Sequence, residues 1–262
     1  MTEVQEQGKI AVLIDAENMT HNKISEIIQE VSLYGHIVTK RAYANWKKCS
    51  PAWETVIKNN AITPIQQFEN SKGKNSSDIT LVIDAMDLLY SRKYDTFVIV
   101  SSDSDFTKLV TRIHDDEIFV IGVGEKKTPE SLIKACDEFI FVENIEPEQV
   151  ESSVKEKDTK ESAPEVPQLS SADRKTLIQR LKKIAETDKY ADEEGWVNIG
   201  SAGSILKRQD PGFDTRTYGF SSLVKLIEAL GQNFELQRRN NNAGRPIIIE
   251  YRIKPKKGLF GF

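Results

Sequence analysis

Histidine and cysteine are scarce in this chain of 262 residues. The cysteines, Cys49 and Cys136, lie far apart and lack CxxC spacing, which argues against a disulfide framework or a zinc site. We expect both to be ordinary buried or half-buried thiols. The three histidines, His21, His36 and His114, leave little material for a Ser-His-Asp triad or a histidine metal centre. Carboxylates must therefore carry any chemistry.

Long apolar runs and nucleotide-binding glycine motifs are also missing. No stretch approaches about 18 consecutive apolar residues, and residues 1–9 are polar and lack the apolar segment of a signal peptide. The chain contains no GxxxxGK[ST] motif, and the GxG at Gly122 lacks a third glycine. We therefore expect a cytoplasmic protein that does not span a membrane and does not bind a dinucleotide.

Charge is divided unevenly along the chain. Residues 1–142 carry a net charge of −5 and residues 143–168 another −5, whereas residues 169–262 carry +6. Such asymmetry suggests that the basic part meets a polyanion while the acidic part holds carboxylates for another purpose.

Changes in composition divide the chain into four predicted segments. A folded domain is expected at 8–143 and a small basic domain at 171–254. The segment 144–170 is rich in Glu, Lys, Ser and Pro and is expected to be a disordered linker. Residues 255–262 form a basic, aromatic tail.

The first domain alternates two kinds of apolar pattern. Short β-branched or aromatic segments predict strands at 9–15, 36–44, 61–66, 96–100, 117–123 and 138–142. Helical spacing appears between them, as in Ile79, Val82, Ile83, Met86 and Leu89. Strand and helix alternating over about 140 residues predict an α/β fold with helices on both faces of a mainly parallel sheet.

The basic domain shows a different order of elements. Apolar spacing predicts helices around Leu177–Ile184, 199–206 and 221–230, with Phe220, Leu223, Leu226, Ile227 and Leu230 as core residues. Two closing segments, 234–238 and 246–252, flank the turn-rich sequence NNNAG and predict a β-hairpin. Three helices and a hairpin in about 80 residues indicate a winged helix.

Four aspartates occupy positions where parallel α/β folds build their sites. Asp15 ends the first predicted strand, Asp103 and Asp105 follow the 96–100 strand, and Asp78 begins the helix at 76–90. Close carboxylates repel one another unless a cation neutralises them, and oxygen-only ligands favour Mg²⁺ or Mn²⁺. Each aspartate taken singly is equally well explained as a helix cap. Together they are better explained as one site.

Three segments resemble the motifs of a known family. LIDAENM, KGKNSSD with the following ITLVIDAMDLL, and VSSDSDFTKLV are similar to NYN domains, the LabA-like branch of the PIN nuclease superfamily, over roughly residues 8–142. The resemblance implies a three-layer, PIN-like fold, a Mg²⁺ or Mn²⁺ site and RNA as substrate.

The resemblance also implies roles for individual residues. It makes Asp15 and Asp103 the principal metal ligands, with Asp105 and Asp78 completing the acidic cluster directly or through water. Asn18 would hold the substrate or the Asp15 loop. Further roles would be orientation of a ligand by Ser102, a phosphate contact by Lys74, and a structural or supporting role for Asp84.

The basic domain resembles the OST-HTH/LOTUS family through the segment GWVNIGSAGSILKRQDPGFDTRTYGFSSLVKLIEAL. The resemblance implies RNA binding or docking of a protein partner. Side chains suited to phosphate contact and base stacking are Lys207, Arg208, Arg216, Tyr218, Lys225, Arg238, Arg239 and Arg245. The alternative is that these basic residues form an ordinary solvated face.

These observations favour a divalent-metal-dependent endoribonuclease that hydrolyses RNA phosphodiester bonds and carries a C-terminal RNA-binding module. A catalytically silent RNA-binding or scaffold protein is the alternative. A phosphatase or phosphotransferase fits less well, because Asp15 is followed by Ala-Glu-Asn and not by an aspartate two residues later.

Overall fold

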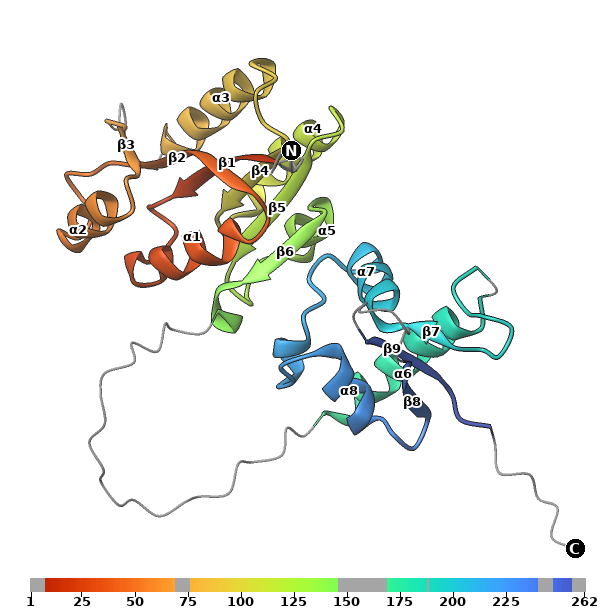
Figure 1. Ribbon diagram of the computed structural model, residues 1–262. Helices are drawn as coiled ribbons and strands as arrows, with labels where there is room; N and C mark the ends of the chain where they lie inside the picture. Colours follow the sequence, from red (N-terminus) through yellow and green to blue (C-terminus); the bar gives the residue numbers. More distant parts are fainter. Residues whose placement is uncertain (1–7, 69–75, 146–168, 188, 240–246, 256–262) are drawn as a thin grey trace, which may run out of the picture. The chain divides into compact units, whose positions relative to one another are not determined.

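The computed structural model describes residues 8–68, 76–145, 169–187, 189–239 and 247–255 (Figure 1). The chain divides into two compact units, Met1–Ser152 and Ser153–Phe262. The predicted linker falls largely outside the described residues, as do the tail from residue 256 onward and two predicted basic residues, Lys74 and Arg245.

The first unit alternates strands and helices along its whole length, as expected for an α/β fold. Its strands are β1 (Lys9–Asp15), β2 (His36–Ala44), β3 (Thr63–Gln66), β4 (Thr96–Val100), β5 (Phe119–Gly124) and β6 (Glu138–Phe141). Its α-helices are α1 (Ile24–Ser32), α2 (Ala52–Asn59), α3 (Ser76–Tyr90), α4 (Thr107–His114) and α5 (Glu130–Ala135).

The six strands form one parallel sheet in the order β3-β2-β1-β4-β5-β6. Strand order therefore reverses between β1 and β4, which pair directly, with Ile14 opposite Val100. Ligands of such sheets bind at the carboxyl ends of the strands where the order reverses. The fold thus places the residues after β1 and β4 at one edge.

Helices cover both faces of the sheet with their apolar sides and give the unit three layers (Figure 1). Helices α1 and α2 pack on one face, where Ile24, Ile27 and Trp53 are buried against the strands. Helices α3, α4 and α5 pack on the other. The central strands read as continuous apolar runs because both of their faces are buried.

Gly122 in β5 has a packing role. A Cβ atom added there would lie 2.4 Å from Cδ2 of Phe139 and 2.7 Å from Sγ of Cys136, too close for either atom. The glycine lets the Phe139 ring lie directly on the strand, which accounts for the GxG sequence without a nucleotide.

The core-facing side of helix α3 coincides only in part with the side that its apolar spacing predicts. Ile79 and Ile83 are 59% and 58% exposed, whereas Leu81, Ala85 and Leu89 are buried. The prediction of the helix was correct, but two of the five residues in the predicted stripe face solvent. Both faces of this helix are rich in apolar residues, so spacing alone did not distinguish them.

The second unit is a winged helix. Its helices are α6 (Ser171–Ala185), α7 (Ile199–Gln209) and α8 (Leu223–Ala229), and its strands β7 (Val197–Asn198), β8 (Phe234–Arg239) and β9 (Ile248–Ile253) form an antiparallel sheet in the order β7-β9-β8. The core includes Phe220, Leu226, Ile227 and Leu230, with Leu223 packed at its margin. The hydroxyl of the buried Tyr251 donates to the carbonyl of Leu181 at 3.0 Å and ties the sheet to α6.

Two smaller expectations can be compared with the described residues. Cys136 is buried and Cys49 half-buried, both as free thiols, as predicted. None of the helices in the described ranges is long and apolar enough to cross a membrane.

Candidate active site

Asp15 is a buried carboxylate held in one orientation at the end of β1. Its side chain is only 1% exposed. Oδ2 accepts hydrogen bonds from Ser101 Oγ at 2.8 Å and Asn18 Nδ2 at 2.9 Å, and Oδ1 accepts from the Asn18 amide at 3.3 Å. Burial raises the pKa of Asp15, and these hydrogen bonds oppose the rise. The side chain is therefore fixed while its negative charge is only partly compensated.

Ser101 links Asp15 to the loop that follows β4. While its hydroxyl donates to Asp15, the same oxygen accepts from the Asp103 amide at 3.1 Å. Asp103 Oδ1 in turn accepts from the Asp105 amide at 2.9 Å and caps the short 3-10 helix Ser104–Phe106. The capping alternative is thus correct for one oxygen of Asp103. Asp103 is half-buried and Asp105 is exposed.

The pKa of Asp78 is raised by burial and by the charges of the other carboxylates. Asp78 lies half-buried in the first turn of α3. Burial is the largest cause that raises its pKa, to about 6, and the charges of Asp15, Asp103, Glu17 and Asp105 follow in that order. The fold therefore brings the other three predicted aspartates within electrostatic range of Asp78, and we refer to Asp15, Glu17, Asp78, Asp103 and Asp105 as the acidic edge.

Glu17 is a member of the acidic edge that the sequence analysis missed. Its Oε2 accepts from the Ser77 hydroxyl at 2.6 Å, and its Oε1 accepts from the Asn45 amide at 2.9 Å. It thereby joins the loop after β1 to the start of α3 and to the end of β2. The available signal was its position in LIDAENM, two residues after Asp15.

The acidic edge has the donor chemistry of a hard divalent cation. Within the described ranges, no three His, Cys, Asp or Glu side chains are close enough together to hold a metal ion by themselves. A Mg²⁺ ion, however, is bound through one or two carboxylates and keeps several waters. Burial and then the charges of the neighbouring carboxylates raise the pKa of Asp78, and such a cation would offset the effect of those charges. Carboxylates spread along one edge fit that requirement.

Other predicted residues lie around this edge in supporting positions. Asn18 donates to Asp15, as its role in holding the Asp15 loop requires. The Ser102 hydroxyl accepts from the Glu125 amide at 2.9 Å and so fastens the loop after β5. Asp84 accepts hydrogen bonds from Arg41 and Tyr43.

The predicted RNA-contacting residues of the winged helix differ in exposure and pairing. Arg208, Lys225 and Arg238 are exposed. Arg216 forms a salt bridge with Asp214 at 2.8 Å, and Arg239 lies 3.4 Å from a Glu250 carboxylate oxygen and 3.6 Å from one of Asp192. Two further side chains are partly covered: Lys207 is half-buried, and Tyr218 is half-buried with its ring 6.1 Å from that of Phe213.

Two domain families match the chain, in the order that the sequence motifs indicate. Residues 9–145 match the NYN domain. The chain belongs to the NYN domain family. Residues 168–246 of this NYN protein match the OST-HTH/LOTUS domain. These matches support a nuclease-type domain followed by an RNA-binding module, and nucleases of this kind generally use divalent metal ions.

Individual relatives of the NYN protein are distant. An uncharacterized protein of Methanocaldococcus jannaschii is 29% identical over 125 residues, which cover 45% of this chain and 48% of the relative. The match thus spans about half the length of that curated relative.

Two solved structures are also similar. A protein of unknown function from Vibrio parahaemolyticus is 20% identical, with a TM-score of 0.45, over 52% of this chain and 94% of that one. An uncharacterized protein from Nitrosomonas europaea is 22% identical, with a TM-score of 0.30, over 42% and 100%.

Replacement of Asp78 by asparagine should stabilise the metal-free NYN domain near neutral pH. With a pKa of about 6 in the native state and an ordinary value of 3.8, Asp78 keeps a proton that the unfolded chain releases between these pH values. The free energy of unfolding therefore falls as pH rises from about 4 to about 7. Because Asp78 is half-exposed and solvent screens part of the repulsion, we expect Asp78→Asn to raise Tm by roughly 2–4 °C at pH 7.

This effect is measured by thermal unfolding in EDTA at pH 4 and pH 7. The stabilisation should be much smaller at pH 4, where Asp78 is neutral in the folded state and only partly ionised in the unfolded chain. An equal Tm difference at both pH values would show that the ionisation of Asp78 is not its cause.

Proposed function

We propose that this NYN protein is a divalent-metal-dependent endoribonuclease in which the acidic edge hydrolyses RNA phosphodiester bonds and the OST-HTH domain retains the RNA. The observation that carries the proposal is the gathering of carboxylates around Asp78 where strand order reverses. Several carboxylates placed close together repel one another, and a divalent cation bound among them would neutralise this repulsion.

Asp15 and Asp103 would be the principal ligands of a Mg²⁺ or Mn²⁺ ion, with Asp78, Asp105 and Glu17 reaching it directly or through water. When bound, the ion supplies an activated water and neutralises charge that develops on the phosphate. The chain itself supplies orientation. Ser101 and Asn18 hold Asp15, and the Asp105 amide holds Asp103, so that these carboxylates keep their places as substrate arrives.

The OST-HTH domain would supply most of the affinity. Exposed Arg208, Lys225 and Arg238 suit contacts to phosphates, and covalent attachment raises the local concentration of RNA at the acidic edge. The same domain offers a surface for protein partners.

The test is a time course with labelled single-stranded and structured RNAs, in Mg²⁺, in Mn²⁺ and in EDTA. We expect internal cleavage in at least one metal and none in EDTA. Binding without cleavage in every metal would reject the nuclease and identify a silent RNA-binding protein.

A further inference from the structure

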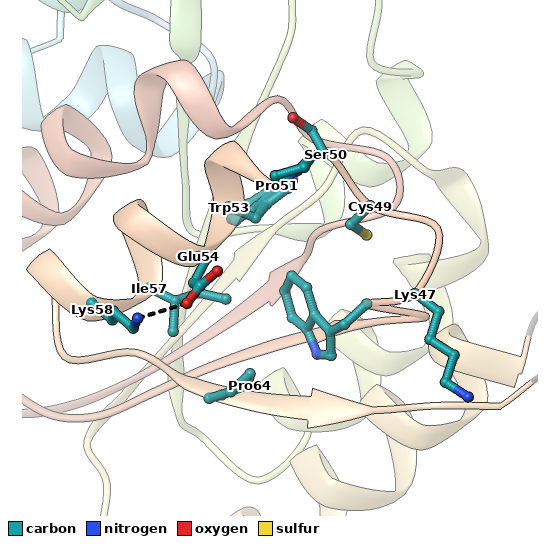
Figure 2. Close-up of a pocket in the computed structure, with 10 residues that line it drawn as sticks. Lys47, Cys49, Ser50, Pro51, Trp53, Glu54, Ile57, Lys58 and Pro64 are labelled. Carbon is teal, nitrogen blue, oxygen red and sulfur yellow. Dashed lines mark hydrogen bonds and ion pairs between the residues drawn. The ribbon is translucent and has the colours of Figure 1, made fainter.

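A cavity of about 590 Å³ opens beside the acidic edge, among α2, the loop before it and β3 (Figure 2). Trp46, Trp53, Ile57 and Pro64 provide its apolar surface. A concave, mostly apolar cavity of this size with a few polar groups at its rim is typical of a ligand site. The mechanism proposed above does not use it.

The two tryptophans present a preformed aromatic surface. Trp53 is buried, and Trp46 is half-buried with its ring centroid 5.8 Å from that of Trp53 in an edge-to-face arrangement. The indole Nε1 of Trp46 donates to the Ile65 carbonyl at 3.0 Å, and its backbone amide donates to Gln66 Oε1 at 3.2 Å. Trp46 is thus held at the ends of β2 and β3, so that a ligand would not have to order it.

Two lysine side chains lie at the rim of this apolar surface. Lys47 and Lys58 lie on opposite sides of the cavity in Figure 2. The exposed Lys47 places Nζ 5.1 Å from the ring centroid of Phe68, while Lys58 is paired with Glu54 at 2.6 Å. Aromatic rings with a basic rim suit a flat, apolar group attached to an anion, which describes a nucleobase on its phosphate.

A second hollow shares lining residues with this cavity and includes one residue of the acidic edge. This hollow of about 520 Å³ is lined by Glu17, His21 and Lys48 and shares Cys49, Ser50 and Trp53 with the first. Because β2 pairs with β1 and neighbouring strands are about 4.8 Å apart, the loop after β2 lies within roughly two strand spacings of Asp15. An RNA strand crossing the acidic edge can therefore extend along these hollows.

We propose that this cavity receives an unpaired nucleobase of the RNA strand, one or two nucleotides from the phosphate at the acidic edge, and that it stacks against Trp46. The inference deepens the proposed function and rests on it for the claim that the bound RNA is cleaved. A base held in a Watson–Crick pair is stacked inside a helix and cannot enter, so the cavity selects single-stranded RNA at the site of cleavage.

The test measures binding in EDTA, so that it does not depend on cleavage. The full chain is titrated with a labelled single-stranded decaribonucleotide and with versions that carry one abasic residue at each position in turn. Base–aromatic stacking of this kind changes affinity by about 5–150-fold. We expect Trp46→Ala to weaken binding by about 10-fold, and one abasic position to weaken binding to the unmodified protein by a similar factor.

The decisive quantity is the coupling between the two changes. If the missing base is the one that stacks on Trp46, the abasic position should cost little further affinity in Trp46→Ala. Trp46→Phe keeps an aromatic face and should bind within about 3-fold of the unmodified protein. Tyr90→Ala removes an exposed aromatic ring at the far end of α3 and should change nothing.

Two outcomes would overturn the cavity as a base site. In the first, the loss of affinity caused by Trp46→Ala and that caused by each abasic position are independent of each other. In the second, Trp46→Ala and Tyr90→Ala reduce affinity equally. Coupling without metal-dependent cleavage would reject the ribonuclease and keep the base site. Metal-dependent cleavage without coupling would reject the base site and keep the ribonuclease.

Discussion

Replacing Asp15 or Asp103 by asparagine is expected to reduce RNA cleavage by at least about 10³-fold, equivalent to about 4 kcal/mol in the activation barrier. Asparagine keeps the size of the side chain and removes the negative charge that a divalent cation requires. RNA affinity in EDTA should change by less than about 3-fold, because we assign most of the binding to the OST-HTH domain. Single-turnover cleavage and titration of the same labelled RNA separate these effects.

The matched control is Asp87→Asn, which removes an exposed carboxylate from α3, more than two turns from Asp78. It changes the net charge equally and should cleave at the unmodified rate. Unchanged cleavage in both Asp15→Asn and Asp103→Asn would remove the acidic edge from the mechanism.

Truncation of the chain after Ser152 is expected to raise KM for RNA by roughly 10–100-fold and to leave kcat within about 2-fold. The apolar cores of the NYN domain draw on residues 10–145, and that of the winged helix on residues 169–253, so each has its own interior. The truncated chain should therefore fold, keep the acidic edge and lose only the tethered RNA-binding module.

Adding residues 153–262 as a separate chain tests whether attachment matters. At micromolar concentration it should not restore the low KM, because the benefit of a tether is an effective concentration in the millimolar range. A truncated protein with an unchanged KM would show that the OST-HTH domain does not retain the substrate.

Some elements of the fold follow directly from the sequence. The observed bounds of β1, β2 and β4 coincide with the expected strands. β1 and β4 are recognisable because strands buried on both faces must be continuously apolar. Helices α2 and α5 were not predicted. Trp53 is the buried residue of α2 and Leu132 that of α5, so neither helix carries an apolar stripe long enough to recognise.

The candidate site was predictable to the extent that strand ends determine it. Asp15 and Asp103 follow neighbouring strands, and parallel pairing brings those ends together. Only its position two residues after Asp15 pointed to Glu17, and the partners of Glu17 and Ser101 could not be predicted because they lie far away in the chain. Glu17 accepts from Ser77, 60 residues later, and Ser101 donates to Asp15, 86 residues earlier.

The direction of the sheet offers a practical handle. All proposed chemistry gathers at the carboxyl ends of the strands, whereas the exposed Lys93 precedes β4 at their amino ends. Seven residues of β1 at about 3.3 Å each separate the two edges by roughly 20 Å. A fluorophore or a surface anchor attached at position 93 would leave the acidic edge and the neighbouring cavity open to RNA, so single molecules could be immobilised in a defined orientation.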